Sequence, residues 1–367
     1  MEIPRIFIAA TKQDEGKTTT ALGILIHLRK HFSNVGYMKP VGQKFVELTD
    51  GIKVDKDVWL VRESFNFNDD AQLMSPVTIP PGFTKNYIDN RNPEKLSKKI
   101  VDAFSKQSVN KDFMLLEGTG HAGVGSVVDL SNARVAELLN SPVIIVSSGG
   151  IGKPIDEIML NASLFKERGV EIAGVILNKV LPNKIQQIKN YVGKALAWHG
   201  LELLGVVPYD PLLSEPTLTE VCRKTKGKIL SGEDKLSTLY SNAVLTADFT
   251  PLLSEKIKPK SLIVTTGSQT ELLIACASEG TSVESLREKV SGILLVDGIE
   301  PKSHIIKMLK LAGLPVIITE ISAFDATAKV SSMVAKTQPD NPEKVEIISN
   351  LFDNHVDMKR IIEKARS

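Results

Sequence analysis

The sequence predicts an α/β fold in two domains, with parallel sheet strands covered by helices on both faces. Short runs that are apolar throughout recur along the chain, for example at 6–10, 113–118 and 143–148. Longer stretches with helical spacing, such as 21–32 and 94–107, lie between them. Fully apolar strands separated by helices are typical of a parallel sheet buried on both faces. At 367 residues the chain is also too long for one typical core.

A change of pattern after the sixth apolar run predicts the domain boundary. The alternation of strand and helix continues to 201–207, and three prolines then interrupt it within 208–218. Beyond them, apolar runs such as 261–267 are again followed by helical stretches. We therefore expect a first domain over residues 1–210 and a second, smaller α/β domain over residues 211–367.

Composition excludes several classes of partner. Apolar residues make up 42% and charged residues 24%, which is globular usage, and the net charge of +2 comes with scattered lysines. No segment approaches the ~20 apolar residues that span a bilayer. Cys222 and Cys276 have no neighbouring ligand pattern, so we expect small buried apolar residues there. We expect a cytoplasmic protein that binds neither nucleic acid nor membrane.

The stretch ATKQDEGKTTTALG, residues 10–23, predicts a phosphate-binding loop between a strand and a helix. Backbone N–H groups and the positive end of the helix point at one spot there, which suits a phosphate. Gly16 allows close approach of the backbone, Lys17 supplies a charge, and the Thr18 hydroxyl is placed to hold magnesium. A chance Gly-Lys-Thr at a helix start is the alternative. The residues expected to bind nucleotide in this loop are Thr11, Glu15, Gly16, Lys17, Thr18 and Thr19.

Further polar residues fall at strand ends, where ligands of parallel sheets bind. Lys39 precedes a proline, Glu117 ends an apolar strand before glycines, and Asn178 ends another strand. A buried strand-end carboxylate usually has a cation or donor nearby. The alternatives are an ordinary surface lysine at 39, a helix cap at Asn178, and a solvated helix face for Asp57. His121 fits a loop histidine, with general acid–base work as the alternative.

The loop resembles a variant found in one class of NTPases. In the spacing Lys12-x-x-x-Gly16-Lys17-Thr18, Thr11 replaces the usual opening glycine and one lysine precedes the other by five residues. This is similar to MinD, the nitrogenase iron protein and dethiobiotin synthetase, and it implies the P-loop NTPase fold, ATP and a homodimer. In several members the extra lysine crosses the dimer interface to the partner's nucleotide.

Other segments resemble dethiobiotin synthetase more specifically: YMKPVGQ (37–43), LLEGTGHAGVG (115–125), KVDKDVWLV (53–61) and GVILNKV (174–180). The resemblance implies that Lys39 approaches phosphate and substrate, and that Asn178 reads adenine. It also implies that Asp57 and Glu117, together with Thr18, hold Mg²⁺. The implied catalytic set is Lys12, Lys17, Lys39 and Glu117.

The second half resembles the DRTGG domain, in the segments 211–221, 262–275, 292–301 and 314–330. A dethiobiotin-synthetase-like ATPase domain followed by a DRTGG domain is the layout of the N-terminal region of long bacterial phosphotransacetylases, where the pair is a regulatory attachment. The name-giving Asp-Arg pair is absent, and Ser268-Gln269-Thr270 stands near its place.

These resemblances imply a Mg²⁺-dependent ATP-binding protein with regulatory or uncharacterised ATPase activity. Its ligands are a nucleotide and a small-molecule substrate or effector. One alternative is an ATP-dependent ligase of the dethiobiotin synthetase or cobyrinic acid a,c-diamide synthase type. Against it, Gly42-Gln43-Lys44 replaces the serine of the synthetase's substrate pocket, and Lys12 replaces its loop aspartate. The other alternative is a module that holds nucleotide without hydrolysis.

Overall fold

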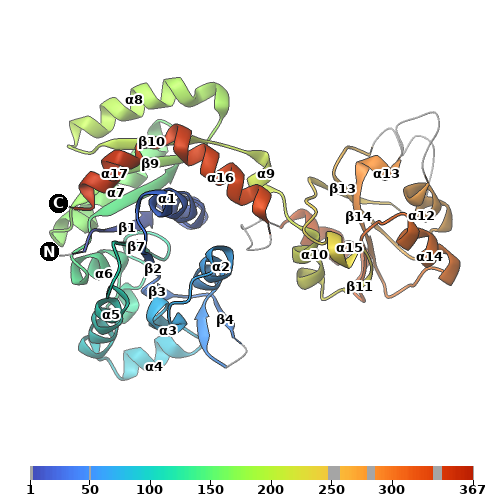
Figure 1. Ribbon diagram of the computed structural model, residues 1–367, viewed down its shortest axis with the longest axis horizontal. Helices are drawn as coiled ribbons and strands as arrows, with labels where there is room; N and C mark the ends of the chain where they lie inside the picture. Colours follow the sequence, from blue (N-terminus) through green and yellow to red (C-terminus); the bar gives the residue numbers. More distant parts are fainter. Residues whose placement is uncertain (1–2, 49–50, 247–256, 279–285, 334–340, 367) are drawn as a thin grey trace. The chain divides into compact units, whose positions relative to one another are not determined.

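The computed structural model describes residues 3–48, 51–246, 257–278, 286–333 and 341–366. The chain forms two compact units (Figure 1). Unit 1 contains the residues up to Asp210 and also the C-terminal helices α16 (Pro342–His355) and α17 (Met358–Lys364). Unit 2 begins at Pro211 and extends through α15 (Ala323–Ser331).

Unit 1 is built on a six-stranded sheet in the order β10-β9-β8-β1-β7-β2. Every neighbouring pair is parallel, and the strand interiors are buried on both faces, as the apolar runs predict. The predicted α/β class with a parallel sheet is confirmed. The strands are β1 (Arg5–Ala10), β2 (Val35–Met38), β7 (Phe113–Glu117), β8 (Val143–Ser148), β9 (Ile172–Val180) and β10 (Leu203–Pro208).

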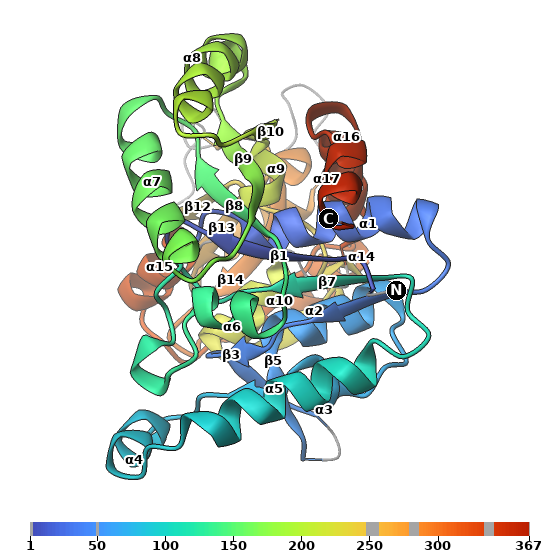
Figure 2. The ribbon, with the colours of Figure 1, turned by 90° about the vertical axis from the view of Figure 1, so that its left-hand side faces the viewer.

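Helices cover both faces of this sheet (Figure 2). On one face, α5 (Pro93–Gln107), α6 (Asn132–Leu138), α7 (Gly152–Glu167) and α8 (Ile185–Trp198) share a core with alternate residues of the strands. On the other face lie α1 (Lys17–His31) and the two C-terminal helices.

Shorter elements complete unit 1 beside β2. They are β3 (Val41–Gly42), which pairs with β6 (Val77–Thr78), the antiparallel pair β4 (Phe45–Glu47) and β5 (Lys53–Asp55), and the helices α2 (Lys56–Phe65), α3 (Ala71–Met74) and α4 (Phe83–Asp89). Single 3-10 turns lie at Ser126–Val128 and Pro182–Lys184.

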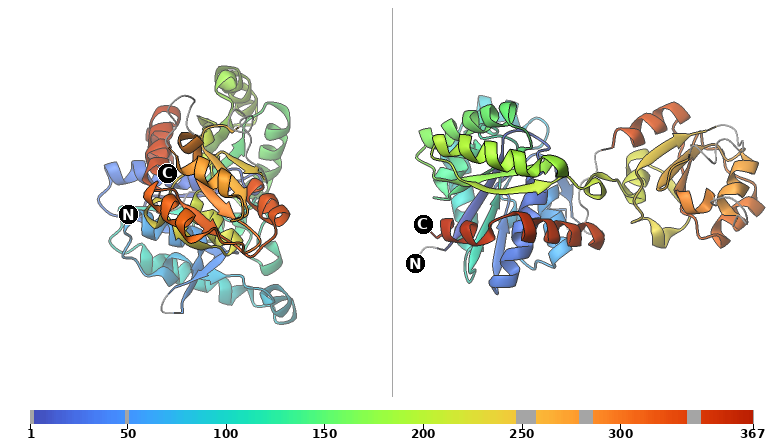
Figure 3. Two further views of the ribbon diagram at one scale, coloured as in Figure 1. Left: turned by 90° about the vertical axis from the view of Figure 1, so that its right-hand side faces the viewer. Right: turned by 90° about the horizontal axis from the view of Figure 1, so that it is seen from above.

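The C-terminal helices correct the expected second domain of residues 211–367, because they belong to unit 1. Phe352 of α16 is fully buried against Gly23 of α1. Val356 forms an antiparallel bridge with Gly205 of β10. Arg5 N donates to Ala365 O at 3.2 Å, so the start of β1 lies beside the residue that follows α17 (Figure 3). The spacing of apolar residues shows that a helix is amphipathic, but not which element its apolar face packs against. The sequence alone therefore did not predict that these helices return to unit 1.

Unit 2 contains a five-stranded sheet in the order β11-β15-β14-β13-β12, parallel except for β11. Helices α12 and α14 pack on one face, and α10 and α15 pack on the other. The strands are β11 (Lys228–Ser231), β12 (Asn242–Leu245), β13 (Ser261–Thr265), β14 (Val290–Leu295) and β15 (Val316–Ile318). The remaining elements are α9 (Pro211–Ser214), α10 (Leu218–Thr225), α12 (Thr270–Ala277), α13 (Leu286–Lys289), α14 (Ser303–Leu311) and a 3-10 turn at Glu233–Lys235.

The structure bears on two further expectations from the sequence, the burial of the cysteines and the lack of a membrane-spanning segment. Both cysteines are free; Cys276 is buried as expected, whereas Cys222 is half-buried and its Sγ donates to Gly227 O at 3.0 Å. Within the described part of the chain, every helix is too short or too polar to traverse a lipid bilayer.

Candidate functional site

The loop between β1 and α1 lies at the carboxyl edge of the unit 1 sheet. Gly16 caps α1 with φ +91°, a left-handed conformation that favours glycine. A Cβ on Gly16 would overlap Nδ2 of Asn178 and lie 3.3 Å from its Cγ. Glycine is therefore required here by backbone conformation and by space. The first N–H groups of α1 follow immediately, and they have no partner within their own helix.

Two strands beside β1 hold this loop in place. Thr11 N donates to Val146 O of β8 at 2.9 Å, and the Thr11 and Ser147 hydroxyls lie 3.1 Å apart. From β9, Asn178 Nδ2 donates to Glu15 O at 3.1 Å, and Lys179 Nζ donates to Asp14 O at 2.7 Å. Asn178 lies within a strand, so the alternative of a helix cap is wrong.

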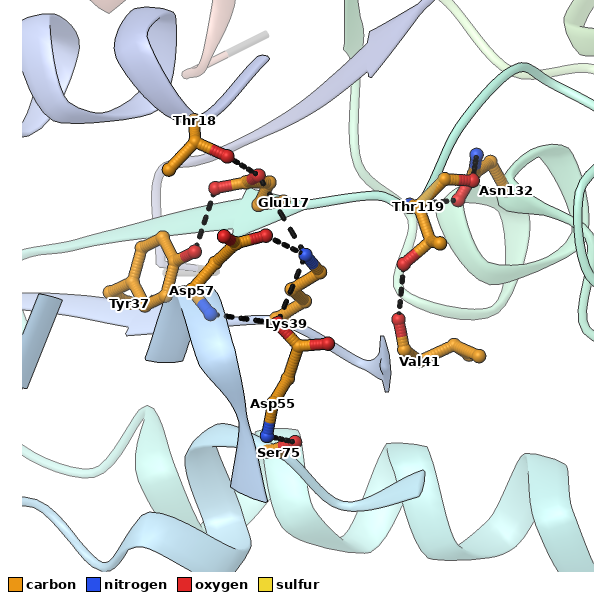
Figure 4. A network of polar contacts seen from close by, with 10 residues as sticks. All are labelled: Thr18, Tyr37, Lys39, Val41, Asp55, Asp57, Ser75, Glu117, Thr119 and Asn132. Carbon is orange, nitrogen blue, oxygen red and sulfur yellow. Dashed lines mark hydrogen bonds and ion pairs between the residues drawn. The ribbon is translucent and has the colours of Figure 1, made fainter. Parts of the chain in front are cut away.

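Glu117 ends β7 and is fully buried beneath the start of α1 (Figure 4). The Thr18 hydroxyl donates to its Oε1 at 2.9 Å, and the Tyr37 hydroxyl donates to its Oε2 at 2.7 Å. Each carboxylate oxygen thus has a hydroxyl donor, which fixes the orientation of the group. One donor comes from the predicted phosphate loop and its helix, and the other from the neighbouring strand β2.

Lys39 follows β2 and is only 5% exposed, which excludes an ordinary surface lysine. Its Nζ donates to Asp57 Oδ2, lies 3.1 Å from Asp55 Oδ1, and lies 3.9 Å from Glu117 Oε1. Asp57 is buried as well, so the solvated-face alternative is wrong. We call Lys39, Asp55, Asp57 and Glu117 the carboxylate cluster (Figure 4).

Burial and charge oppose each other in the carboxylate cluster. Burial raises the pKa of Glu117 and of Asp55, and the positive charge of Lys39 counteracts that rise in both. Burial alone would lower the pKa of Lys39, but Asp57, Asp55 and Glu117 outweigh it, so that pKa lies above its ordinary value. Burial, then the negative charge of Glu117, raises the pKa of Tyr37, which keeps its hydroxyl a neutral donor.

Sequence reasoning missed Asp55 and Tyr37. Asp55 precedes α2 and caps it, since its Oδ1 accepts a hydrogen bond from Asp57 N at 2.9 Å. The pair of aspartates in KVDKD was the available signal. Tyr37 lies two residues before Lys39, and alternate residues of a strand point to the same face. That periodicity could have placed Tyr37 with Lys39.

The remaining predicted residues lie around the loop. Lys12 is exposed, and its Nζ lies 3.1 Å from Glu15 Oε1 and 3.3 Å from Glu157 Oε2 of its own chain. Lys17 begins α1, and its charge, like that of Lys39, opposes the rise that burial causes in the pKa of Glu117. Thr19 is half-buried in the first turn of α1. His121 is an exposed loop residue whose Nδ1 accepts from Gly123 N at 3.2 Å.

The oxygen atoms beside the loop are of the kinds that Mg²⁺ accepts as ligands. No group of three or more His, Cys, Asp or Glu in the described ranges is arranged to hold a metal ion by itself. Mg²⁺ usually keeps several waters and takes one or two carboxylates together with phosphate oxygens. The adjoining Thr18 hydroxyl and Glu117 carboxylate, 2.9 Å apart beside a phosphate-type loop, fit that pattern. The residues present therefore suit Mg²⁺ brought in with a nucleotide.

Curated relatives match almost the whole of this chain. The curated phosphate acetyltransferase of Nitrosomonas europaea is 25% identical over 374 residues, covering 98% of this chain and 51% of the relative. That of Nitratidesulfovibrio vulgaris is 22% identical, covering 97% of this chain and 51% of the relative. The chain thus spans about half the length of the curated relatives it matches.

Two solved structures match this chain with low scores. The MinC:MinD cell division complex of Aquifex aeolicus matches with a TM-score of 0.36 and 16% identity, covering 57% of this chain and 83% of that chain. The CBS and DRTGG domains of Clostridium perfringens pyrophosphatase match with a TM-score of 0.28 and 16% identity, covering 48% of this chain and 86% of that chain.

Family models account for most of the chain. The AAA domain model matches residues 4–217, and the DRTGG domain model matches residues 220–333. The first match covers the phosphate-type loop and the whole carboxylate cluster. The chain therefore belongs to the AAA domain family and carries a DRTGG domain after it, the layout of the N-terminal region of long phosphotransacetylases.

Proposed function

We propose that unit 1 binds ATP with Mg²⁺ and that this binding serves regulation, with slow ATP hydrolysis at the same site. The observation that supports this most directly is the position of Glu117. Its Oε1 accepts from Thr18 of the loop helix and lies 3.9 Å from Lys39 Nζ. A hydroxyl, a carboxylate and a lysine thus meet where the phosphate-type loop ends, which is the set that phosphate and Mg²⁺ require together.

Within this proposal, each loop residue has a defined task. The N–H groups that open α1, together with the Lys17 ammonium, bind the terminal phosphates. Gly16 lets the backbone approach them without a side chain in between. Asn178 supports the loop through Glu15 O and is proposed to read the adenine ring from the same position.

Thr18 and Glu117 would hold the metal, directly or through water. When bound, Mg²⁺ would neutralise part of the negative charge on the phosphates. Tyr37 keeps Glu117 oriented because its hydroxyl donates to Oε2 and leaves Oε1 facing Thr18. We place Asp57 beside Glu117 as a further acidic group of the metal site, and Lys39 as the cation that approaches the phosphates.

A regulatory role is favoured over a ligase. The matched relatives are phosphate acetyltransferases of about twice this length, and Gly42-Gln43-Lys44 and Lys12 stand where dethiobiotin synthetase has its pocket serine and loop aspartate. We infer that unit 1 regulates such an activity in response to nucleotide, and that unit 2 takes a small-molecule effector. We place the protein in the cytoplasm as a homodimer, in which the exposed Lys12 reaches the partner's nucleotide.

Loss of Lys17 tests nucleotide binding. Lys17→Ala removes a charged contact to phosphate, which is worth about 1.5–3 kcal/mol, so ATP affinity should fall by roughly 10- to 150-fold. Isothermal titration calorimetry with the non-hydrolysable analogue AMPPNP gives the affinity. Lys194→Ala, which removes an exposed lysine of α8, is the matched control and should bind like the parent. Equal affinity of Lys17→Ala and the parent would refute the loop assignment.

Glu117→Gln separates binding from turnover. It keeps the shape of the side chain and removes its charge, so nucleotide should still bind while phosphate release falls at least tenfold. Release by the parent is measured with and without a diaminopelargonate-like diamine. Stimulation by the diamine would favour the ligase, and no release under either condition would favour the non-hydrolysing module.

A further inference from the structure

The carboxylate cluster contains a lysine where its three carboxylates converge. The ammonium of Lys39 donates to Asp57, lies 3.1 Å from Asp55 Oδ1, and lies 3.9 Å from Glu117 Oε1. All four side chains are at least 90% buried, so water screens the attraction between their charges only weakly. The ammonium therefore lies where the negative potential of the cluster is greatest.

One oxygen atom links this lysine to the proposed metal position. Glu117 Oε1 is the atom that accepts from the Thr18 hydroxyl, at 2.9 Å, and it is also the Glu117 atom nearest to Lys39. The other oxygen of Glu117 is held by Tyr37 on the far side. Any cation that binds between Thr18 and Glu117 must therefore share Oε1 with the lysine.

We propose that Lys39 is a tethered cation that competes with Mg²⁺ for this cluster, so that the metal enters only together with a nucleotide. The inference rests on the proposed function of the same site and adds an order of binding to it. A free Mg²⁺ gains little, because Lys39 already neutralises the same oxygens and repels a second cation at this range. The phosphates of ATP offer the Lys39 ammonium a replacement partner and so release the carboxylates.

The alternative assigns Lys39 only structural work, as the counter-charge that keeps three buried carboxylates folded together. Both roles predict lower stability when Lys39 is removed, because the carboxylates lose their partner. Only the competing-cation role predicts a gain of metal affinity. Metal binding in the absence of nucleotide therefore distinguishes the two.

The experiment titrates the full-length chain with Mn²⁺ alone and follows free Mn²⁺ by electron paramagnetic resonance. Lys39→Met should bind one Mn²⁺ at least tenfold more tightly than the parent, and the double variant Lys39→Met/Asp55→Asn should lose most of that gain. Lys111→Met is the matched control. Its ammonium pairs with Asp69 at 2.8 Å and its side chain is 10% exposed, so it removes a similar lysine away from the site.

Equal Mn²⁺ affinity of Lys39→Met and the parent would overturn the proposal, as would an equal gain in Lys111→Met. If Lys39→Met does not fold, Mn²⁺ binding by the parent and by Asp57→Asn tests the proposal instead. Tight uptake of one Mn²⁺ by the parent alone, lost in Asp57→Asn, would also overturn it, and weak uptake that Asp57→Asn does not change would support it. AMPPNP binding by the parent is measured separately, so a failure of the proposed function is recognised as such.

Discussion

Replacing Gly23 by alanine should destabilise unit 1, although the same change in a helix normally stabilises. Alanine gains about 1 kcal/mol over glycine in a helix interior. At Gly23, however, the new Cβ would overlap Cγ and Cδ2 of Phe352 and lie 2.7 Å from its Cδ1. The ring is fully buried, so it cannot move away into solvent. Overpacking costs about 1–3 kcal/mol, so the net change is a loss of up to about 2 kcal/mol.

Removing the Phe352 ring should reverse the effect of Gly23→Ala on the stability of unit 1. Phe352→Ala alone should cost about 3–5 kcal/mol, as expected for a fully buried phenylalanine. In that background the Cβ at position 23 meets empty space, and Gly23→Ala should stabilise by about 1 kcal/mol. The two changes are therefore coupled by about 1–3 kcal/mol, which a double-mutant cycle measures.

The assay is urea-induced unfolding followed by tryptophan fluorescence. Both tryptophans of the chain, Trp59 in α2 and Trp198 in α8, belong to unit 1, so the signal reports that unit alone. Gly193→Ala in α8 is the matched control, because its Cβ would lie 3.7 Å from Leu203 Cδ2 in ordinary contact, and it should stabilise. Equal stabilisation by Gly23→Ala and Gly193→Ala would refute the packing of α16 on α1.

Three further predictions concern individual side chains. Asn178→Ala should lower the ratio of ATP to GTP affinity in calorimetry, and a fall of both affinities by one factor would leave Asn178 only its support of the loop. If Lys12 acts across a two-fold dimer, mixing inactive Lys12→Ala and Lys17→Ala proteins should restore about a quarter of parental phosphate release; no recovery despite demonstrated subunit exchange would exclude that role. Burial raises the pKa of Cys276 to about 12, so at pH 8 its thiolate is scarce and a thiol reagent should modify Cys222 first, with Cys276 labelling rising about tenfold per pH unit. Faster labelling of Cys276 would contradict the packing of unit 2.

The sequence predicted the parts of this fold that depend on local pattern. Apolar runs separated by helical spacing indicated the parallel sheet, since such strands are stable only when both faces are covered. The same pattern brought the loop, Lys39, Glu117 and Asn178 to one edge, because parallel strands end together. Their roles there stay predictions.

What the sequence did not reveal depends on contacts between distant residues. For Lys39 the sequence left an ordinary surface lysine open as the alternative, because the three carboxylates around its ammonium come from separate elements. Likewise, Lys12 lies beside Glu157 of α7, a pairing that spacing within the loop does not contain. Charge balance in a buried cluster is a property of the folded chain, and it became visible only in the structure.

The return of α16 and α17 to unit 1 has a consequence for the folding of this protein during its synthesis. When β10 leaves the ribosome, the surface of α1 at Gly23 and the backbone edge that Val356 will bridge are still uncovered. The whole of unit 2 is translated before α16 follows, a delay on the order of ten seconds at typical elongation rates. Unit 2 can complete its own core within that time, whereas unit 1 cannot. The surface of α1 that α16 covers thus stays exposed to chaperones until α16 has been made, and a chain cut after α15 lacks part of its first domain rather than part of its second.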